Sequence, residues 1–238
     1  MSQETFVLKQ FSINQDKCPM KIGTDAVLLG SWVTPTNEKR ILDVGTGTGI
    51  LALMLAQKST AHIDAIDIDI TAVEQAKENV EFCKWRDRLV VTHATIQQYS
   101  KQVNYKYDLI VTNPPYFTDS SKPPEEGRTL ARHNDYLPFN ELIESVIKLL
   151  EPKGKFFLIL PTKEAGIFKE LAEKKGLKLS KLLRVRTRQD KETEKRHMMQ
   201  FEFFPSSFSE STIIIEKDAR HEYTDEYKEL TKEYYINF

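Results

Sequence analysis

The fold of this chain is decided by the stretch Ile41-Leu42-Asp43-Val44-Gly45-Thr46-Gly47-Thr48-Gly49-Ile50-Leu51. Its apolar start predicts a buried strand over Arg40–Val44. The glycines that follow allow a tight turn and a close approach of the backbone to a ligand. A helix is expected directly afterwards, over Ile50–Lys58. A strand, a glycine-rich loop and a helix in this order indicate the start of a parallel sheet.

Beyond this stretch, short β-branched runs alternate with longer helical patterns, which is typical of βαβ units. The expected strands are Arg40–Val44, His62–Asp67, Leu89–His93, Tyr107–Thr112, Lys155–Leu160, Lys178–Val185 and Met198–Phe204. The expected helices are Ile50–Lys58, Thr71–Cys83, Phe139–Leu150 and Lys163–Lys175. No clear helix separates the last two strands, so we expect an antiparallel hairpin that closes the sheet. The predicted fold is α/β, with seven mostly parallel strands, one antiparallel strand and helices on both faces.

The amino-acid composition limits the classes of function that are expected. The chain has 238 residues, of which 40% are hydrophobic and 29% charged, as in an ordinary globular protein. Its formal net charge of -1 means that nucleic-acid binding requires a local basic patch. Cys18 and Cys83 have no partners at metal-ligand spacing, so no metal is expected. Membrane-span and signal-peptide patterns are missing, and we therefore expect no membrane contact and a cytoplasmic location.

Three segments are expected to build one domain. Residues 1–39 form an extension over the ligand site, residues 40–205 the α/β domain, and residues 206–238 an acidic, aromatic tail. In the extension, Gly23-Thr24-Asp25 is expected to cap a helix, with Thr24 or Asp25 satisfying its backbone donors. The tail is expected to pack on the domain as a helix, because apolar residues recur at helical spacing. They are Tyr223, Tyr227, Leu230 and Tyr234.

The glycine loop differs from two common phosphate-binding loops. A dinucleotide loop counted from Gly45 needs glycine where Ile50 stands, and a P-loop needs Gly-Lys-Ser/Thr. Asp43 would repel phosphate, but it would attract an ammonium group or orient the loop. Asp67 lies 24 residues later, at the end of the second strand, and is placed to accept from both hydroxyls of a ribose. The alternative for Asp67 is a charge at a helix N-terminus.

A second motif, Asn113-Pro114-Pro115-Tyr116, follows the strand predicted over Tyr107–Thr112. Two consecutive prolines cannot continue a strand ladder, so the chain must turn sharply there. The turn presents the Asn113 amide, a free backbone carbonyl and an aromatic ring. Two acceptors and one stacking face suit a planar amide or amine. The alternative is a turn that only ends the strand.

The glycine loop, Asp67 and the Asn-Pro-Pro-Tyr turn together resemble the class I, Rossmann-like methyltransferases that use S-adenosylmethionine and methylate planar nitrogen, on adenine N6 or on glutamine. The resemblance implies that Asp43, Gly45, Gly47 and Gly49 hold the cofactor and that Asp67 holds its ribose. It also implies that three groups hold the target nitrogen: the Asn113 amide, the Pro114 carbonyl and the Tyr116 ring. The sulfonium methyl is already electrophilic, so the reaction needs no metal.

One position departs from these families. They usually place an acidic residue near the cofactor adenine after the third strand, where this chain has Thr95. A threonine hydroxyl can still accept from the adenine amino group. Thr24 is a further candidate, for contact with the cofactor carboxylate.

The segments before and after the α/β domain make the resemblance more specific. The segment Phe6–Gln15, followed by Cys18, Met20-Lys21 and Gly23-Thr24-Asp25, is similar to the bacterial tRNA1(Val) adenine(37) N6-methyltransferases. This similarity implies that the substrate is adenine 37, next to the anticodon of a valine tRNA. The arginine-rich turn of that family corresponds to Arg128 and Arg132, and its Tyr-rich tail to Tyr223–Phe238.

Several basic residues are candidates for contact with RNA. In a strand, Arg184, Arg186 and Arg188 share one face and can contact consecutive phosphates. The alternative is the solvated outer face of an edge strand. Lys21 extends the candidate patch, and Arg128 and Arg132 lie near the proposed active site.

Three other functions remain open on these residues. Methylation of a glutamine side chain on a translation factor fits the Asn-Pro-Pro-Tyr turn equally well, although the flanks and the basic strand favour RNA. Methylation of guanine N2 on ribosomal RNA is a second alternative. A non-catalytic RNA-binding module is a third, against which the intact motif residues argue. A monomer is expected.

Overall fold

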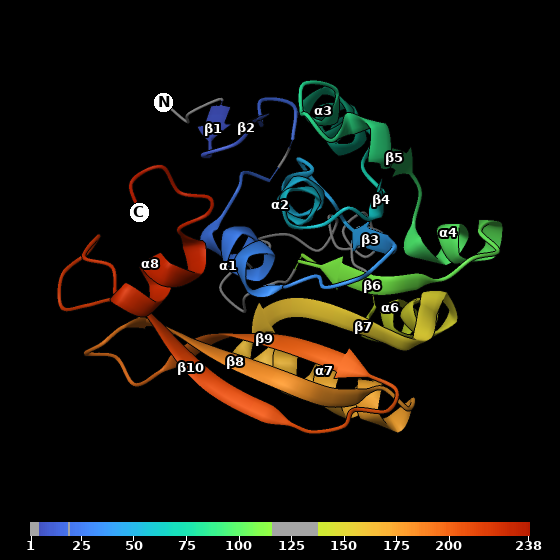
Figure 1. The fold of residues 1–238 in the computed structure, drawn as a ribbon. Coiled ribbons are helices and arrows are strands. Elements are labelled where there is room, and N and C mark those ends of the chain that lie inside the picture. The colour runs from blue at the N-terminus through green and yellow to red at the C-terminus, as the bar shows by residue number, and fades with distance from the viewer. Residues whose placement is uncertain (1–4, 19, 116–137) are drawn as a thin grey trace, which may run out of the picture.

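The computed structural model describes residues 5–18, 20–115 and 138–238. A single large sheet with helices on both faces forms its centre (Figure 1). The strands of this sheet are β3 (Arg40–Val44), β4 (His62–Asp67), β5 (Leu89–His93), β6 (Tyr107–Thr112), β7 (Leu150–Pro161), β8 (Lys178–Arg188), β9 (Glu194–Glu202) and β10 (Ser209–Glu216). Their order across the sheet is β10-β8-β9-β7-β6-β3-β4-β5. The bounds of β3, β4, β5 and β6 are those predicted from the sequence.

The sheet confirms the predicted α/β fold and differs from it in strand number. β9 runs antiparallel to β7 and β8, and every other pairing in the sheet is parallel. The prediction of seven strands is wrong, because β10 adds an eighth and lies where a tail was expected. Its β-branched residues pair in parallel with β8, with Ile213 opposite Val185. The predicted hairpin of β8 and β9 forms, but β10, not the hairpin, closes this side of the sheet.

Helices cover both faces because the strands alternate two sets of apolar side chains. Ile41 and Leu109 point to one face, and Leu42 and Ile110 point to the other, and all four are fully buried. The first face is covered by α1 (Thr24–Trp32), α2 (Ile50–Lys58), α3 (Ile70–Glu81) and α8 (Asp225–Thr231). The second face is covered by α4 (Ile96–Gln102), α6 (Phe139–Leu149) and α7 (Thr162–Lys174). None of the described helices has the length and apolarity that crossing a membrane requires.

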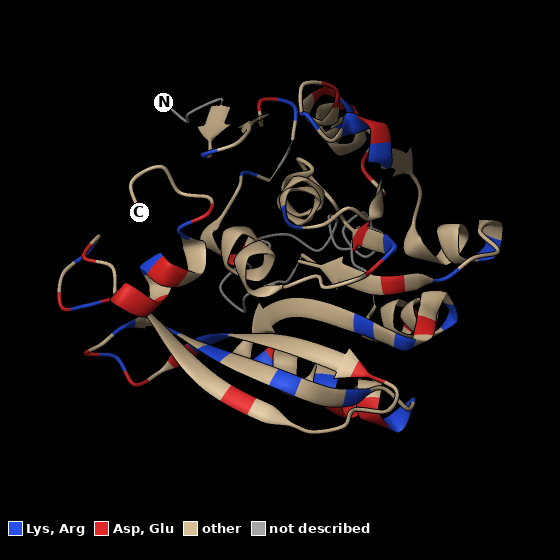
Figure 2. Ribbon diagram, viewed as in Figure 1, with Lys and Arg blue, Asp and Glu red and all other residues tan. Residues whose placement is uncertain are grey.

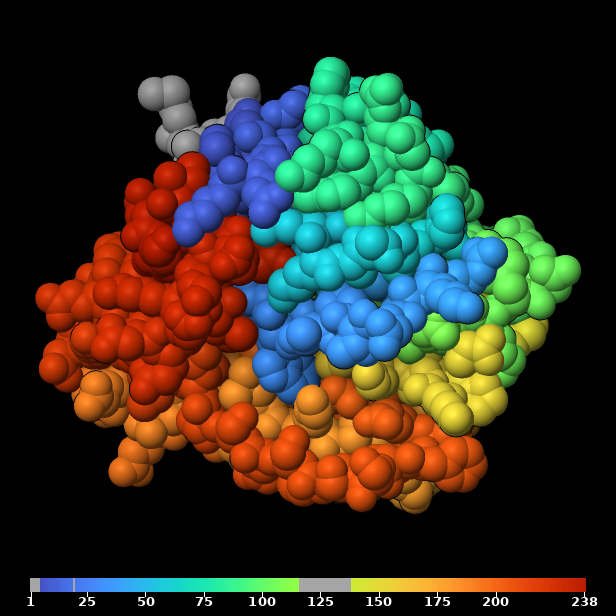
Figure 3. All heavy atoms as spheres, viewed as in Figure 1, coloured from blue at the N-terminus to red at the C-terminus, as the bar shows by residue number. Residues whose placement is uncertain are grey.

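The N-terminal and C-terminal parts of the chain pack against each other (Figure 3). β1 (Thr5–Val7) and β2 (Ser12–Asn14) form a small antiparallel hairpin, and Lys9 just after β1 donates its N–H to the Tyr234 carbonyl at 2.9 Å. Tyr234 is fully buried, and its hydroxyl donates to the Met54 carbonyl at 3.0 Å. The segment after β10 therefore packs on α2 and on the N-terminal hairpin. A short 3-10 helix, Arg86–Arg88, precedes β5.

Candidate active site

The two predicted motifs meet at one edge of the sheet, where parallel strands end. Val44, the last residue of β3, lies opposite Ile66 of β4 and Thr112 of β6. Gly45 and Asn113 each follow directly, on neighbouring strands. β4 and β5 extend to one side of β3, and β6 and β7 to the other. Such a reversal of strand order marks the crevice where open α/β sheets bind ligands.

The glycine loop adopts a backbone that other residues rarely reach. Gly45, Gly47 and Gly49 have φ angles of 70°, 56° and 86°, in the left-handed region. The N–H groups of Gly45 and Thr46 both donate to the Ile66 carbonyl, at 2.9 and 3.0 Å, which holds the loop against β4. A Cβ built on Gly45 meets no atom within 4 Å. The loop is therefore fixed at its base, with open space above Gly45.

Asp43 is fully buried beneath this loop. Its Oδ2 accepts from the Thr46 hydroxyl at 2.6 Å and from the Ala52 N–H at 3.1 Å. Oδ1 has no hydrogen-bond partner among the described residues. Burial raises the pKa of this carboxyl to about 7. Asp43 thus orients the loop and the start of α2, one of its two predicted roles, while attraction of an ammonium group stays a prediction.

Asp67 links the end of β4 to the glycine loop. Its Oδ2 accepts from the Gly47 N–H at 2.8 Å, and its Oδ1 accepts from the Asp69 N–H at 2.9 Å. Burial raises its pKa. A carboxylate has about four acceptor sites, so two remain for a diol. The helix-terminal role belongs instead to Asp69, which caps α3 by accepting from the Thr71 and Ala72 N–H groups.

The Asn-Pro-Pro turn begins at the neighbouring strand end. The Thr112 hydroxyl donates to the Val44 carbonyl at 2.8 Å and ties β6 to β3 below the turn. Asn113 is half-buried, Pro114 buried and Pro115 exposed. Within the described ranges, no residue hydrogen-bonds to the Asn113 amide. Tyr116, the third predicted catalytic group, lies outside the described residues.

The ends of β4 and β5 form the side of the site predicted for adenine. Thr95 is the N-cap of α4, where its hydroxyl accepts from the Gln98 N–H at 3.1 Å in a capping box. Its contact with adenine stays a prediction. Ile68, which follows Asp67 and is 55% exposed, was not among the predicted site residues. His93 Nε2 lies 2.8 Å from the Ile68 carbonyl oxygen and holds this apolar surface in place.

Taken together, these groups fit a nucleoside that carries a cationic group. Asp43 keeps an unpaired buried acceptor, Asp67 keeps two acceptor sites, and Ile68 offers an exposed apolar face. Ile68 had no signal of its own in the sequence, because single exposed apolar residues are common on protein surfaces.

The N-cap of α1 is Gly23, and Asp25 lies in the first turn of the helix. The predicted role of Thr24 or Asp25 in satisfying backbone donors stays a prediction. Asp25 accepts from Arg196 Nε at 2.7 Å, and this ion pair joins α1 to β9. Thr24 is exposed, and its contact with the cofactor stays a prediction. Lys21 donates from Nζ to the Gln15 carbonyl.

The three alternating arginines lie on an inner strand, since β8 is flanked by β9 and β10. The edge-strand alternative is therefore wrong. Arg184 pairs with Glu194 at 2.9 Å and with Glu210 at 2.6 Å. Arg186 donates to the Lys191 and Gln189 carbonyls, and Arg188 pairs with Asp190. Figure 2 accordingly shows basic and acidic segments interspersed along β8, β9 and β10.

Contact of these arginines with RNA stays a prediction. Two other RNA candidates, Arg128 and Arg132, lie outside the described residues.

Known proteins resemble this chain in sequence and in fold. The family model of the Methyltransferase small domain matches residues 20–174. A Bacteroides fragilis protein named tRNA1(Val) (adenine(37)-N6)-methyltransferase is 45% identical over 237 residues, which are 99% of both chains. A protein of the same name from Trichodesmium erythraeum is 42% identical over 241 residues, with 100% of both chains covered.

Solved structures also resemble this chain in fold. A predicted O-methyltransferase from Agrobacterium tumefaciens superposes with a TM-score of 0.69 at 16% identity, over 88% of this chain and 96% of that one. A SAM-dependent methyltransferase from the same organism gives a TM-score of 0.57 at 17% identity, over 86% and 72%. At such identities the likeness concerns the fold alone.

Proposed function

Because the chain belongs to the family of tRNA1(Val) (adenine(37)-N6)-methyltransferases, we propose that it methylates N6 of adenine 37 in a valine tRNA, with S-adenosylmethionine as the donor. The observation that carries this proposal is the register of β3 and β6. It brings the glycine loop and the Asn113 turn to adjacent strand ends, and Oδ1 of Asp43 beneath the loop has no partner among the described residues. A donor site and an acceptor site therefore share one edge of the sheet.

The cofactor would be held by the ends of β3 and β4. The Gly45–Gly49 loop would approach it with its backbone, and Asp67 would accept from the two ribose hydroxyls. Ile68 would cover one face of the adenine, and Thr95 and Thr24 are the remaining candidates for polar contact. When bound, S-adenosylmethionine supplies an electrophilic methyl group on a sulfonium.

The residues of the turn would bind the methyl acceptor, whose amine is a poor nucleophile. The N6 lone pair of adenine is delocalised into the ring, so the amine is a poor nucleophile. The Asn113 side-chain oxygen and the Pro114 carbonyl would each accept one N6 hydrogen. As positive charge develops on the nitrogen, both hydrogen bonds strengthen, which stabilises the transition state more than the ground state. Tyr116 would stack on the base and fix its direction of approach.

The remaining parts of the proposal concern RNA and organisation. Arg128, Arg132 and Lys21 are candidate contacts to the RNA, as are Arg184, Arg186 and Arg188, whose guanidinium groups would exchange internal partners for phosphate. Residues 40–216 would form the catalytic domain, because β10 belongs to its sheet, and residues 1–39 and 217–238 would pack onto it. We propose that the enzyme acts as a cytoplasmic monomer without a metal.

The test is mass spectrometry of tRNA nucleosides from cells with and without the gene. We expect N6-methyladenosine to disappear from one valine tRNA. Purified enzyme should restore it on that tRNA and leave a transcript with guanine at position 37 unmodified. When cell extract is incubated with the enzyme and labelled S-adenosylmethionine, label that protease removes and RNase does not would favour the glutamine alternative. Loss of N2-methylguanosine instead would favour ribosomal RNA. Either result would overturn the proposal.

A further inference from the structure

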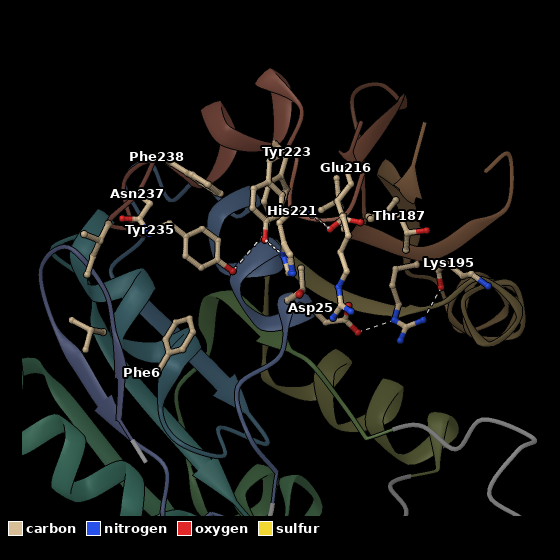
Figure 4. Close-up of a pocket in the computed structure, with 18 residues that line it drawn as sticks. Phe6, Asp25, Thr187, Lys195, Glu216, His221, Tyr223, Tyr235, Asn237 and Phe238 are labelled. Atoms are coloured by element: carbon tan, nitrogen blue, oxygen red, sulfur yellow. Dashed lines mark hydrogen bonds and ion pairs between the residues drawn. The ribbon is translucent and has the colours of Figure 1, made fainter. Parts of the chain in front are cut away.

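A second hollow lies beside the candidate active site. It has a volume of about 830 Å³, and it is lined by the C-terminal segment, β1, the first turn of α1 and the ends of β8, β9 and β10 (Figure 4). None of the residues that carry the glycine loop, Asp67 or the Asn113 turn lines it, and of the described candidates for cofactor contact only Thr24 does, at its edge with α1. Apart from Thr24, the mechanism proposed above gives no role to the residues of this pocket.

The pocket opens at the same edge of the sheet as the active site. Arg196 at the start of β9 lies opposite Pro161 at the end of β7, and Val185 near the end of β8 lies opposite Arg196. Strands in a sheet are about 4.8 Å apart, so the ends of β9 and β8 lie about 10 and 15 Å from the end of β6. An RNA whose target base reaches Asn113 is then close enough to place a neighbouring nucleotide over the pocket.

One wall of the pocket is aromatic. The rings of Tyr223 and Tyr235 pack edge-to-face against Phe238, with centroids 5.1 and 5.2 Å away, and Phe6 packs against Tyr235 at 6.3 Å. Figure 4 shows Phe6, Tyr235 and Phe238 on one side and Thr187 and Lys195 on the other. Tyr223 and Phe238 are only half-buried, so their rings offer surface to a flat ligand.

The pocket lining carries a net positive charge, because Lys195, Arg196 and Arg220 outnumber Asp25 and Glu216. Arg196 is paired with Asp25, and the Glu216 carboxylate accepts from the His221 N–H at 2.9 Å. Lys195 and Arg220 are exposed, and no ion pair joins either side chain to another residue of the described ranges. An aromatic wall that faces two available cations matches the base and the phosphate of a nucleotide.

We propose that this pocket binds a nucleotide that flanks the target adenine in the tRNA. Its base lies against Tyr223 and Phe238, and its phosphate lies between Lys195 and Arg220. The proposal rests on the proposed function for the identity of the RNA. Binding here adds affinity and sets which base reaches Asn113, and it takes no part in methyl transfer.

The charge of the pocket is tested with the double variant Lys195→Gln/Arg220→Gln. A matched control is Lys153→Gln/Lys178→Gln, which removes two exposed lysines near the amino ends of β7 and β8, at the opposite edge. Affinity for the anticodon stem-loop of the valine tRNA is measured without methyl donor over a range of salt. We expect roughly tenfold weaker binding for the pocket variant and a salt slope smaller by about 0.7, because the contact with one phosphate is lost. The control should bind like wild type.

The base is tested by pairing Tyr223→Leu with abasic RNA. Removal of a stacked base should weaken wild-type binding roughly tenfold at one position beside the target. The same abasic RNA should cost the Tyr223→Leu variant almost nothing more, because the stacking partner is already gone. Binding of S-adenosylmethionine, measured by calorimetry, reports whether each variant is folded.

The pocket proposal would be overturned if the Lys195→Gln/Arg220→Gln variant bound the RNA as tightly as wild type. It would also be overturned if the Tyr223→Leu substitution and the abasic RNA weakened binding by independent, additive amounts. If wild type binds the RNA through the pocket and does not methylate it, the proposed function fails and the pocket survives. If wild type methylates the RNA and the pocket variants keep the wild-type KM for it, the proposed function survives and the pocket proposal fails.

Discussion

The two halves of the sheet use polar residues in opposite ways. Around β3, β4 and β6, Asp43 Oδ1 and the Asn113 amide have no hydrogen-bond partner among the described residues. Within β8 and β9, each arginine is already bonded to a carboxylate or carbonyl of the protein. Unpaired buried polar atoms are costly to a fold, whereas paired surface charges cost little. Spare bonding capacity, more than charge, therefore marks the reactive half of this molecule.

The sharpest way to test this contrast is Asn113→Ala. We expect kcat to fall by about 10²–10³, the usual effect of removing one group that stabilises the transition state. Affinity for S-adenosylmethionine, measured by calorimetry, should stay near wild type. Asn104→Ala changes the same residue type at an exposed position before β6 and should leave kcat intact. Full activity in Asn113→Ala would remove the basis for the assignment.

The buried Asp43 predicts an unusual dependence of stability on pH. Its pKa is raised from 3.8 to about 7, so between these values the folded state binds more protons than the unfolded state. The free energy of unfolding should therefore decrease as pH rises from about 4 to about 7, by a few kcal/mol in urea denaturation. Asp43→Asn should flatten this slope, and Asp87→Asn, at an exposed position, should not. A slope unchanged in Asp43→Asn would contradict the prediction.

Asp67→Asn tests the spare acceptors on the carboxylate. Loss of charge-assisted hydrogen bonds is expected to weaken S-adenosylmethionine binding by roughly 10- to 100-fold, corresponding to about 1.5–3 kcal/mol. Asp69→Asn is the matched control, because asparagine also caps helices well and Asp69 faces α3. Equal losses in the two variants would show that the effect comes from the local fold and not from the ribose.

The smallest effect is expected from Arg184→Gln in the other half. Its two ion pairs are partly exposed, so their loss should lower the free energy of unfolding by about 0.5–1 kcal/mol. Because the guanidinium group is already engaged, RNA affinity should change less than in Lys195→Gln/Arg220→Gln. Denaturation measures the free energy of unfolding, and a binding isotherm on the same sample measures the RNA affinity. A larger loss of RNA affinity in Arg184→Gln would show that the inner partners do exchange for phosphate.

The part of the fold that follows local pattern was predictable from the sequence. Buried parallel strands read as apolar runs between glycines and helices, and β3 to β6 have their predicted bounds. β10 was missed although its β-branched run over residues 212–215 is typical of a strand, because exposed polar residues begin the strand and the segment as a whole is acidic and aromatic. α4 was missed because it has only seven residues, although the Thr95–Gln98 capping box marks its start.

In the candidate site, the sequence could predict residue types at strand ends and not the partners they choose. Asp25 shows the limit, since its ion pair with Arg196 spans 171 positions and no local pattern announces it. The same holds for the C-terminal pocket, whose walls come from segments at both ends of the described chain.

The position of β9 has a consequence for how the chain folds during synthesis. β9 lies between β7 and β8 in the sheet, although it follows both in the sequence. A nascent chain that has emerged as far as Arg188 can pair β3 to β7, but its β8 has no strand to join. Only when β9 arrives can β8, and then β10, add to the sheet. The half that carries the proposed chemistry is thus complete in its strands before the half that carries the proposed RNA pocket begins to form.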